Sequence, residues 1–310
     1  MEVRDWSYEE LPEFNEELEG VEVIETTGNE VGVSYLHDIE YANIDGIPLC
    51  LQILVPASRN VGFIPFAEKQ TFAVPCFVFV QGSAWMQQYV YAQVAQVAKL
   101  AEKGYVCAIV EYRHSGIASF PAQAKDARNA IRYLRQNAEK YGIDSERMIV
   151  AGDSSGGHTA MWAALIHDDN SADNCFPGVS AEVKGIVDFY GSTSVMAADS
   201  NPTTLNHCLP DSPEGMVMGK KNLLEHRELA RALSVECNID GDTKLPPVLM
   251  FHGTKDRLVN CQGSAILYKR LKNTGHRVKF YLIKGADHGG AEFWTNRIVG
   301  IIDEFCQSCF

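Results

Sequence analysis

A serine in a glycine-flanked turn is the first feature of this sequence that could do chemistry. Residues 152–156 read Gly-Asp-Ser-Ser-Gly, which matches G-x-S-x-G with Ser154 at the centre. The frame excludes Ser155 as the central residue, because position 153 would then have to be glycine and it is Asp153. Apolar runs at 148–151 and 160–164 flank the motif, as expected of a strand that turns sharply into a helix. Such a turn exposes the hydroxyl, so Ser154 is the candidate nucleophile.

A serine hydroxyl needs a histidine base and a carboxylate that orients the base. Asp256 follows the strand-like run at 247–251, and His288 follows the run at 278–283. The chain order Ser, Asp, His is the one expected when all three residues stand on loops after parallel strands. We therefore predict Ser154, Asp256 and His288 as the catalytic residues.

Other acids and histidines in the sequence are alternatives to these three residues. Asp188, at the end of the preceding strand, is the alternative carboxylate, whereas Asp287 is too close to His288 in sequence to meet its ring. His252 is interpreted as a packing residue at a strand end, because too little chain separates it from Asp256. His158 is interpreted as a buried structural histidine on the helix behind the turn.

Acyl transfer also places negative charge on a carbonyl oxygen, which needs preorganised donors. The N–H of Ser155, at the start of a helix, is one predicted donor. The second is expected in the loop Gln-Gly-Ser-Ala-Trp at 81–85, from the backbone N–H groups of Ser83 and Ala84, with the Ser83 hydroxyl as a further donor. Gly82, Trp85 and Tyr89, in or just after this loop, are predicted to contact substrate.

The elements that must position these residues alternate along the chain. Strand-like runs from 105 to 283 are separated by stretches with helical spacing of apolar residues, which predicts a mostly parallel sheet covered by helices on both faces. Strand-like segments at 31–41, 49–55 and 72–80 predict an antiparallel entry into this sheet. We expect one α/β domain over residues 1–310. Residues 192–240 interrupt the alternation and are expected to form a small cap-like insertion.

Composition restricts the classes of partner. The formal net charge is −13, which repels nucleic acid and anionic membrane surfaces. The apolar runs are shorter than the roughly 18 residues of a membrane span, and the acidic start does not resemble a signal peptide. Nine cysteines, some inside apolar strands, fit reduced thiols. We therefore expect a cytoplasmic protein whose partner is a small-molecule substrate rather than nucleic acid or membrane.

Several stretches resemble α/β-hydrolase esterases. They begin at Tyr112-Arg113-His114, at Ala138 and at Val150, and the last includes Gly-Asp-Ser-Ser-Gly-Gly-His at 152–158. They are most similar to lipases and esterases related to hormone-sensitive lipase and to feruloyl-esterase-like carbohydrate esterases. The resemblance implies an α/β-hydrolase fold and no metal or organic cofactor. One departure concerns the oxyanion loop, since these families commonly have H-G-G-G or H-G-G-x-W where this chain has Gln81 in place of the histidine.

The sequence therefore predicts a serine hydrolase that cleaves carboxylic esters through an acyl-enzyme. Short acyl esters and aromatic or carbohydrate esters are the expected substrates. An arylformamidase, another amidase or a peptidase could use the same three residues. A receptor for small molecules on a hydrolase scaffold is the alternative from a different class, because the fold alone does not determine the activity.

Overall fold

The computed structural model describes residues 3–7, 9–58, 73–167, 170–200 and 202–310. The chain divides into two compact units, Met1–Glu30 and Val31–Phe310. The described residues of the first unit contain no helix or strand. The α/β domain predicted over residues 1–310 therefore begins at Val31.

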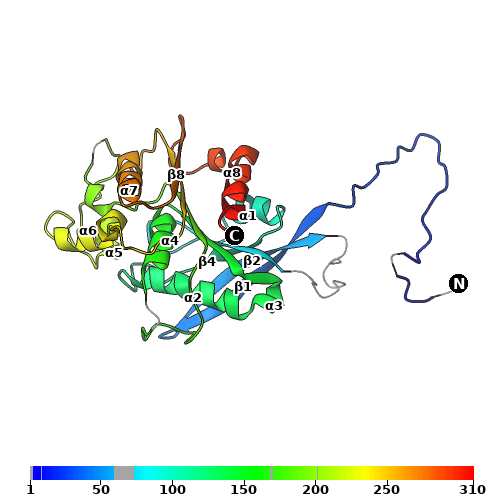
Figure 1. Ribbon diagram of the computed structural model, residues 1–310, viewed down its shortest axis with the longest axis horizontal. Helices are drawn as coiled ribbons and strands as arrows, with labels where there is room; N and C mark the ends of the chain where they lie inside the picture. The colour runs from blue at the N-terminus through cyan, green and yellow to red at the C-terminus, as the bar shows by residue number, and fades with distance from the viewer. Residues whose placement is uncertain (1–2, 8, 59–72, 168–169, 201) are drawn as a thin grey trace. The chain divides into compact units, whose positions relative to one another are not determined.

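An eight-stranded sheet forms the centre of the second unit (Figure 1), with the strand order β1-β2-β4-β3-β5-β6-β7-β8. The first two strands form a hairpin around Asp45 and Gly46, both with positive φ, as a two-residue turn requires. The hairpin joins β4 in antiparallel register, and all the later pairs are parallel. The strands are β1 (Val31–Ile44), β2 (Ile47–Ser58), β3 (Val74–Val80), β4 (Val106–Val110), β5 (Ile143–Asp153), β6 (Gly185–Phe189), β7 (Val248–Gly253) and β8 (Val278–Ile283). The predicted fold class is confirmed.

Helices cover both faces of this sheet (Figure 1). On one face lie α1 (Val94–Ala101) and α8 (Asn296–Gln307), and on the other lie α2 (Ala122–Gln136), α4 (Ser155–Leu165) and α7 (Cys261–Asn273). The central strands β3, β4, β6 and β7 are buried almost throughout. Their apolar runs lack alternation because both faces are covered. The helical stretch after Pro121 is divided at Asn137, and α3 (Ala138–Tyr141) follows as a short separate helix.

In the described part of the segment between β6 and β7, the chain forms two short α-helices and two 3₁₀ turns. They are the 3₁₀ turns η2 (Val195–Ala197) and η3 (Val235–Asn238) and the helices α5 (Pro213–Val217) and α6 (Arg227–Leu233). All four fall within the predicted insertion at 192–240. They enclose a small apolar core made by Trp85, Val195, Val217, Met218, Leu223, Ala230 and Leu233. Because Trp85 comes from the loop after β3, this core joins the insertion to that loop.

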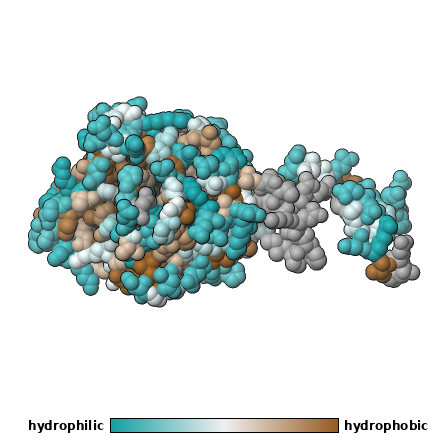
Figure 2. All heavy atoms as spheres, turned by 60° about the horizontal axis from the view of Figure 1, so that its bottom comes forward, coloured by the Kyte–Doolittle hydropathy of each residue, from teal (hydrophilic) through white to brown (hydrophobic). Residues whose placement is uncertain are grey.

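On the face shown in Figure 2, hydrophilic residues dominate the surface of the second unit, and apolar residues lie in small areas between them. No helix in the described part of the chain is long and apolar enough to span a membrane. All nine cysteines are free thiols.

Candidate active site

Ser154 lies in the turn between β5 and α4, where its backbone has φ 53° and ψ −126°. Non-glycine residues rarely adopt such values, and they persist only where the surroundings enforce them. Here the Ser154 N–H donates to the carbonyl oxygen of Phe189 at the end of β6, at 2.9 Å. The neighbouring strand therefore holds the turn that presents the hydroxyl.

The three predicted catalytic residues meet in one hydrogen-bonded chain. His288 Nε2 lies 2.9 Å from Ser154 Oγ, and His288 Nδ1 lies 2.7 Å from Asp256 Oδ2. An ionised carboxylate only accepts, so the Nδ1 carries the proton and the Nε2 lone pair faces the serine hydroxyl. The edge of Tyr190 packs against the imidazole at 4.8 Å between ring centroids and limits its rotation.

The Asp256 carboxylate is fully buried and has four nitrogen partners. Its Oδ1 accepts from the N–H groups of Leu258 and Val259 at 2.9 and 2.8 Å. Its Oδ2 accepts from His288 at 2.7 Å and lies 3.1 Å from His252 Nε2. Burial alone would raise the pKa of Asp256, but the interactions with His252 and His288 lower it by more. The pKa of Asp256 therefore lies well below its ordinary value. The carboxylate therefore stays ionised beside His288.

Gly253 brings the loops that carry Asp256 and His288 together. A Cβ at this position would lie 2.4 Å from the carbonyl oxygen of Ala286 and 2.6 Å from that of Asp287. Real Cβ atoms do not approach backbone oxygens so closely, so the two loops can meet only where β7 ends in glycine.

The alternative acids and histidines lie elsewhere. The Asp188 carboxylate is buried against the N–H of Gly191, and burial raises the pKa of Asp188 to about 7. Asp287 accepts from the backbone N–H and the guanidinium of Arg257, at 3.0 and 2.6 Å. His158 is buried, and its Nε2 donates to the carbonyl oxygen of Leu233, as expected of a structural histidine.

His252 is the functional candidate that the sequence interpretation missed. We expected a packing residue, yet its Nε2 contacts the Asp256 carboxylate. The chain turns at Thr254 and Lys255, and this turn brings the Asp256 carboxylate to the His252 side chain. The turn-forming Gly-Thr-Lys-Asp after the histidine was the only signal for this contact.

The oxyanion loop differs from the expectation at Ser83. Its N–H donates to Ser155 Oγ at 2.9 Å and its hydroxyl donates to the Met86 carbonyl oxygen at 2.6 Å, so both of its donors are engaged. Among the described residues, the N–H groups of Ala84 and Ser155 have no hydrogen-bond acceptor. Ala84 has φ 57°, a left-handed conformation that turns the backbone at this point. The donors that remain for a carbonyl oxygen are thus Ala84 and Ser155.

A chain of hydroxyl groups fixes this loop to α4. Because the Ser83 hydroxyl donates to Met86, it can only accept from Tyr112 Oη, which lies 3.1 Å away. Tyr112 then accepts from Ser155 Oγ at 3.3 Å. Each hydroxyl proton has one acceptor, so the direction of the whole chain is determined. The sequence singled out Tyr112 only as part of the esterase resemblance.

The residues predicted to contact substrate have three different environments. Gly82 donates to Asp153 Oδ1 at 2.7 Å, and a Cβ there would lie 2.8 Å from the Cβ of Ser154, so Gly82 joins the loop to the nucleophile turn. Trp85 is 1% exposed and packs in the core of the insertion, so its predicted place in a substrate pocket is not met. Its large apolar ring is buried against the insertion instead. Tyr89 is 70% exposed, and its ring packs against that of Tyr91.

Gln81, the departure from the family pattern, supports the oxyanion loop. Its side-chain Nε2 donates to the backbone carbonyl oxygen of Tyr89 at 2.7 Å, and its backbone carbonyl oxygen accepts from Gln88 Nε2 at 2.9 Å. Gln88 also donates to Val110 O and accepts from the Tyr112 N–H. These hydrogen bonds hold the loop at 81–89 against the end of β4.

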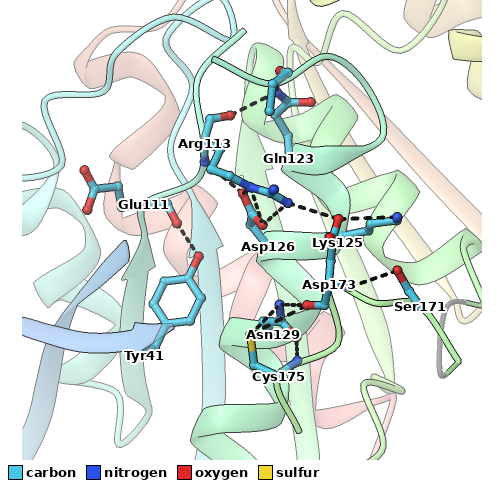
Figure 3. Close-up of polar contacts among 11 residues, drawn as sticks. Tyr41, Glu111, Arg113, Gln123, Lys125, Asp126, Asn129, Ser171, Asp173 and Cys175 are labelled. Carbon is cyan, nitrogen blue, oxygen red and sulfur yellow. Dashed lines mark hydrogen bonds and ion pairs between the residues drawn. The ribbon is translucent and has the colours of Figure 1, made fainter. Parts of the chain in front are cut away.

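A buried ion pair fixes the segment after β4 (Figure 3). Arg113 donates to both carboxylate oxygens of Asp126 on α2, at 2.8 to 3.1 Å, and Asp173 lies on the other side of the guanidinium at 3.3 Å. Tyr41 donates to the carbonyl oxygen of Glu111 at 2.6 Å. Tyr112, between these anchors, is held where it meets Ser83 and Ser155.

A profile of the BD-FAE family matches residues 63–271, about two thirds of the chain. The chain belongs to the BD-FAE family. Its expected kinship with feruloyl-esterase-like α/β-hydrolases is thereby confirmed.

Relatives of this BD-FAE member include the esterase LipC of Mycobacterium tuberculosis, 28% identical over 225 residues that cover 72% of this chain and 54% of LipC. The chain spans about half the length of the curated relatives it matches first. Two solved structures share the fold at 22% identity. A truncated carbohydrate esterase from gut microbiota has a TM-score of 0.74 over 92% of this chain and 98% of that one. Esterase 2 of Thermogutta terrifontis, with propionate bound, has a TM-score of 0.67 over 91% and 94%.

Proposed function

We propose that this protein hydrolyses carboxylic esters through an acyl-enzyme formed on Ser154. The hydrogen-bonded chain from Asp256 through His288 to Ser154 supports this most directly, since it places an accepting nitrogen 2.9 Å from the hydroxyl. The Ser-His-Asp arrangement activates a serine for attack on acyl groups wherever it occurs.

In the first half of the reaction, Ser154 Oγ attacks the ester carbonyl carbon while its proton passes to His288 Nε2. The imidazolium is stabilised by the Asp256 carboxylate. As the carbon–oxygen bond to the alcohol breaks, His288 returns the proton to the leaving oxygen. Water then enters, gives a proton to His288 and attacks the acyl carbon. As the bond from the acyl carbon to Ser154 Oγ breaks, His288 returns this proton to Oγ, and the carboxylic acid leaves.

We assign the oxyanion hole to the N–H groups of Ala84 and Ser155. The Ser155 N–H also lies at the first turn of α4, where the helix dipole favours negative charge. Ser83 contributes indirectly, because its bond to Ser155 Oγ and the Tyr112 hydroxyl chain keep the loop beside the helix. Donors fixed before the reaction stabilise the oxyanion without reorganising.

For the substrate, we favour short acyl esters and aromatic or carbohydrate esters. The carbohydrate esterase of the same fold and the family membership support a carbohydrate ester, and the Thermogutta esterase, solved with propionate and with butyrate, supports a short acyl chain. The insertion at 192–240 is proposed to act as the cap over this substrate, and the exposed Tyr89 as a contact to it.

The test is turnover of p-nitrophenyl esters with two- to eight-carbon acyl chains, together with acetylated xylose, methyl ferulate and N-formylkynurenine. Wild type should release p-nitrophenol from the acetate ester with an initial burst, and Ser154→Ala should abolish both the burst and the turnover. Ser180→Ala, at an exposed serine, is the matched control and should behave as wild type. Undiminished turnover by Ser154→Ala would refute the proposal. Preference for the formamide would assign an amidase instead.

A further inference from the structure

His252 lies at the end of β7 with no exposed surface, and it takes no direct part in the proton transfers above. Its Nε2 lies 2.9 Å from the carbonyl oxygen of Val259 and 3.1 Å from Asp256 Oδ2. Its Nδ1 lies 2.8 Å from Ser264 Oγ on α7. Both ring nitrogens are therefore bound inside the protein.

These partners determine the tautomer. A carbonyl oxygen has no proton to give, so the Nε2 of His252 must carry the hydrogen that reaches Val259 O. The same nitrogen lies 3.1 Å from Asp256 Oδ2, so the positive end of its N–H dipole is also close to the carboxylate. The Nδ1 is then an acceptor for the Ser264 hydroxyl. His252 thus presents a fixed donor to Asp256 without requiring a charge of its own.

The two oxygens of Asp256 are held by different parts of the molecule. Oδ1 is held by the backbone of its own loop, through the N–H groups of Leu258 and Val259. Oδ2 faces His288, a side chain that must move protons during the reaction, and His252, which is fixed from two sides. Among the described residues, the other partner of Oδ2 is His288, the residue that the carboxylate has to orient.

We propose that His252 is a positioning residue for the Asp256–His288 pair. Its Nε2–H fixes Oδ2 in the orientation that receives the Nδ1 proton of His288, and Ser264 fixes His252 in turn. Its N–H dipole also offsets part of the negative charge that Asp256 presents to His288. The inference rests on the proposed ester hydrolysis.

Other titratable groups surround the pair and are left intact by the substitutions below. They come from every element that packs against it: Asp153 at the end of β5, Asp188 and Tyr190 at the end of β6, Cys261 on α7, and Arg257 and Asp287 in the two loops.

The test compares His252→Leu, which removes the donor, with His252→Gln, whose amide N–H extends to about the place of Nε2. The matched control is His276→Leu, because His276 also bonds a carbonyl oxygen and a hydroxyl, those of Thr243 and Thr274, without touching the three catalytic residues. With p-nitrophenyl acetate, kcat should fall about tenfold or more in His252→Leu, with KM within about twofold. His252→Gln should recover most of the loss, and His276→Leu should retain wild-type kcat.

Two further measurements separate positioning from general packing. In His252→Leu the acid limb of the kcat/KM profile should move to higher pH, because less of the Asp256 charge is neutralised, and in His252→Gln it should not. The downfield proton NMR signal of the His288 Nδ1–H should also shift in His252→Leu. If His252→Leu does not fold, Ser264→Ala replaces it, with an expected loss in kcat of about threefold.

An unchanged acid limb together with kcat within twofold of wild type in His252→Leu, or in Ser264→Ala if that variant is needed, would overturn the inference. Equal losses in His252→Leu and His276→Leu would do the same, since they would report stability only. If wild type itself shows no turnover that depends on Ser154, the proposed function fails. The NMR shift then still tests whether His252 positions the pair.

Discussion

Replacing Asp256 by asparagine should prevent His288 from acting as the base toward Ser154, while the shape of the site stays unchanged. The asparagine oxygen will take the place of Oδ1, because the N–H groups of Leu258 and Val259 donate there. Its NH₂ group then occupies the place of Oδ2, where it faces the N–H of His252 and of His288. His252 cannot change its tautomer while Val259 O accepts its proton, so His288 must change.

The changed tautomer carries its proton on Nε2, which faces Ser154 Oγ at 2.9 Å. A protonated nitrogen cannot accept the proton of the nucleophile. The corresponding substitution in a serine protease, where the geometry is likewise preserved, lowers kcat about 10⁴-fold. That factor corresponds to about 5 kcal/mol of lost transition-state stabilisation, and we expect a loss of the same order here.

The assay is kcat/KM for p-nitrophenyl acetate at about pH 8. Asp303→Asn is the matched control. Asp303 lies on α8, away from the site, and its carboxylate accepts a hydrogen bond from Tyr105 at 2.6 Å. Circular dichroism of both variants checks that the fold is retained.

Retention of more than about a tenth of wild-type kcat/KM in a folded Asp256→Asn variant would refute this reasoning. It would mean that His288 keeps its accepting nitrogen toward Ser154 without the carboxylate. A large loss in Asp303→Asn would equally show that the effect is not specific to the site.

Three further predictions concern stability and loop geometry. Because the pKa of Asp188 is raised to about 7, the folded state holds this proton after the unfolded state has lost it, and stability falls as the pH rises from about 4 to 7. Asp188→Asn should therefore exceed wild type in urea unfolding free energy at about pH 8, by up to about 4 kcal/mol, and match it near pH 4. Gly253→Ala should lower kcat about tenfold or more by separating two loops, whereas Gly241→Ala, which meets no atom within 4 Å, should not. Asp126→Ala should cost about 3–5 kcal/mol in urea unfolding, since it leaves a buried guanidinium short of its main partner; Asp144→Ala, at a more exposed pair, should cost about 1 kcal/mol or less.

Much of the fold could be predicted because its signals are local. Strands β4, β6, β7 and β8 lie where continuous apolar runs predicted them, and the helices start and stop near the expected glycine and proline residues. The division at Glu30 could not be predicted, since the first 30 residues, rich in glutamate, show no pattern that sets them apart from the domain that follows. Helix boundaries such as the break at Asn137 depend on packing and were not visible either.

The site divides in the same way. Ser154, Asp256 and His288 could be selected from the sequence because each follows a strand of a parallel sheet, and parallel strands bring their carboxyl ends to one edge. The residues that hold them could not be selected. Ser83 was expected as a donor to substrate, yet its N–H is engaged by Ser155 Oγ, and Trp85 was expected at the substrate, yet it is buried under the insertion.

The sequence alone thus determined which side chains can do the chemistry and on which strand ends they stand. Only the tertiary structure decided which donors are free, which are engaged, and which residue stands behind the carboxylate. Motif and strand order depend on the local chain and on topology, whereas hydrogen-bond partners such as His252 and Asp256 depend on distances of about 3 Å between groups whose spacing the sequence does not encode.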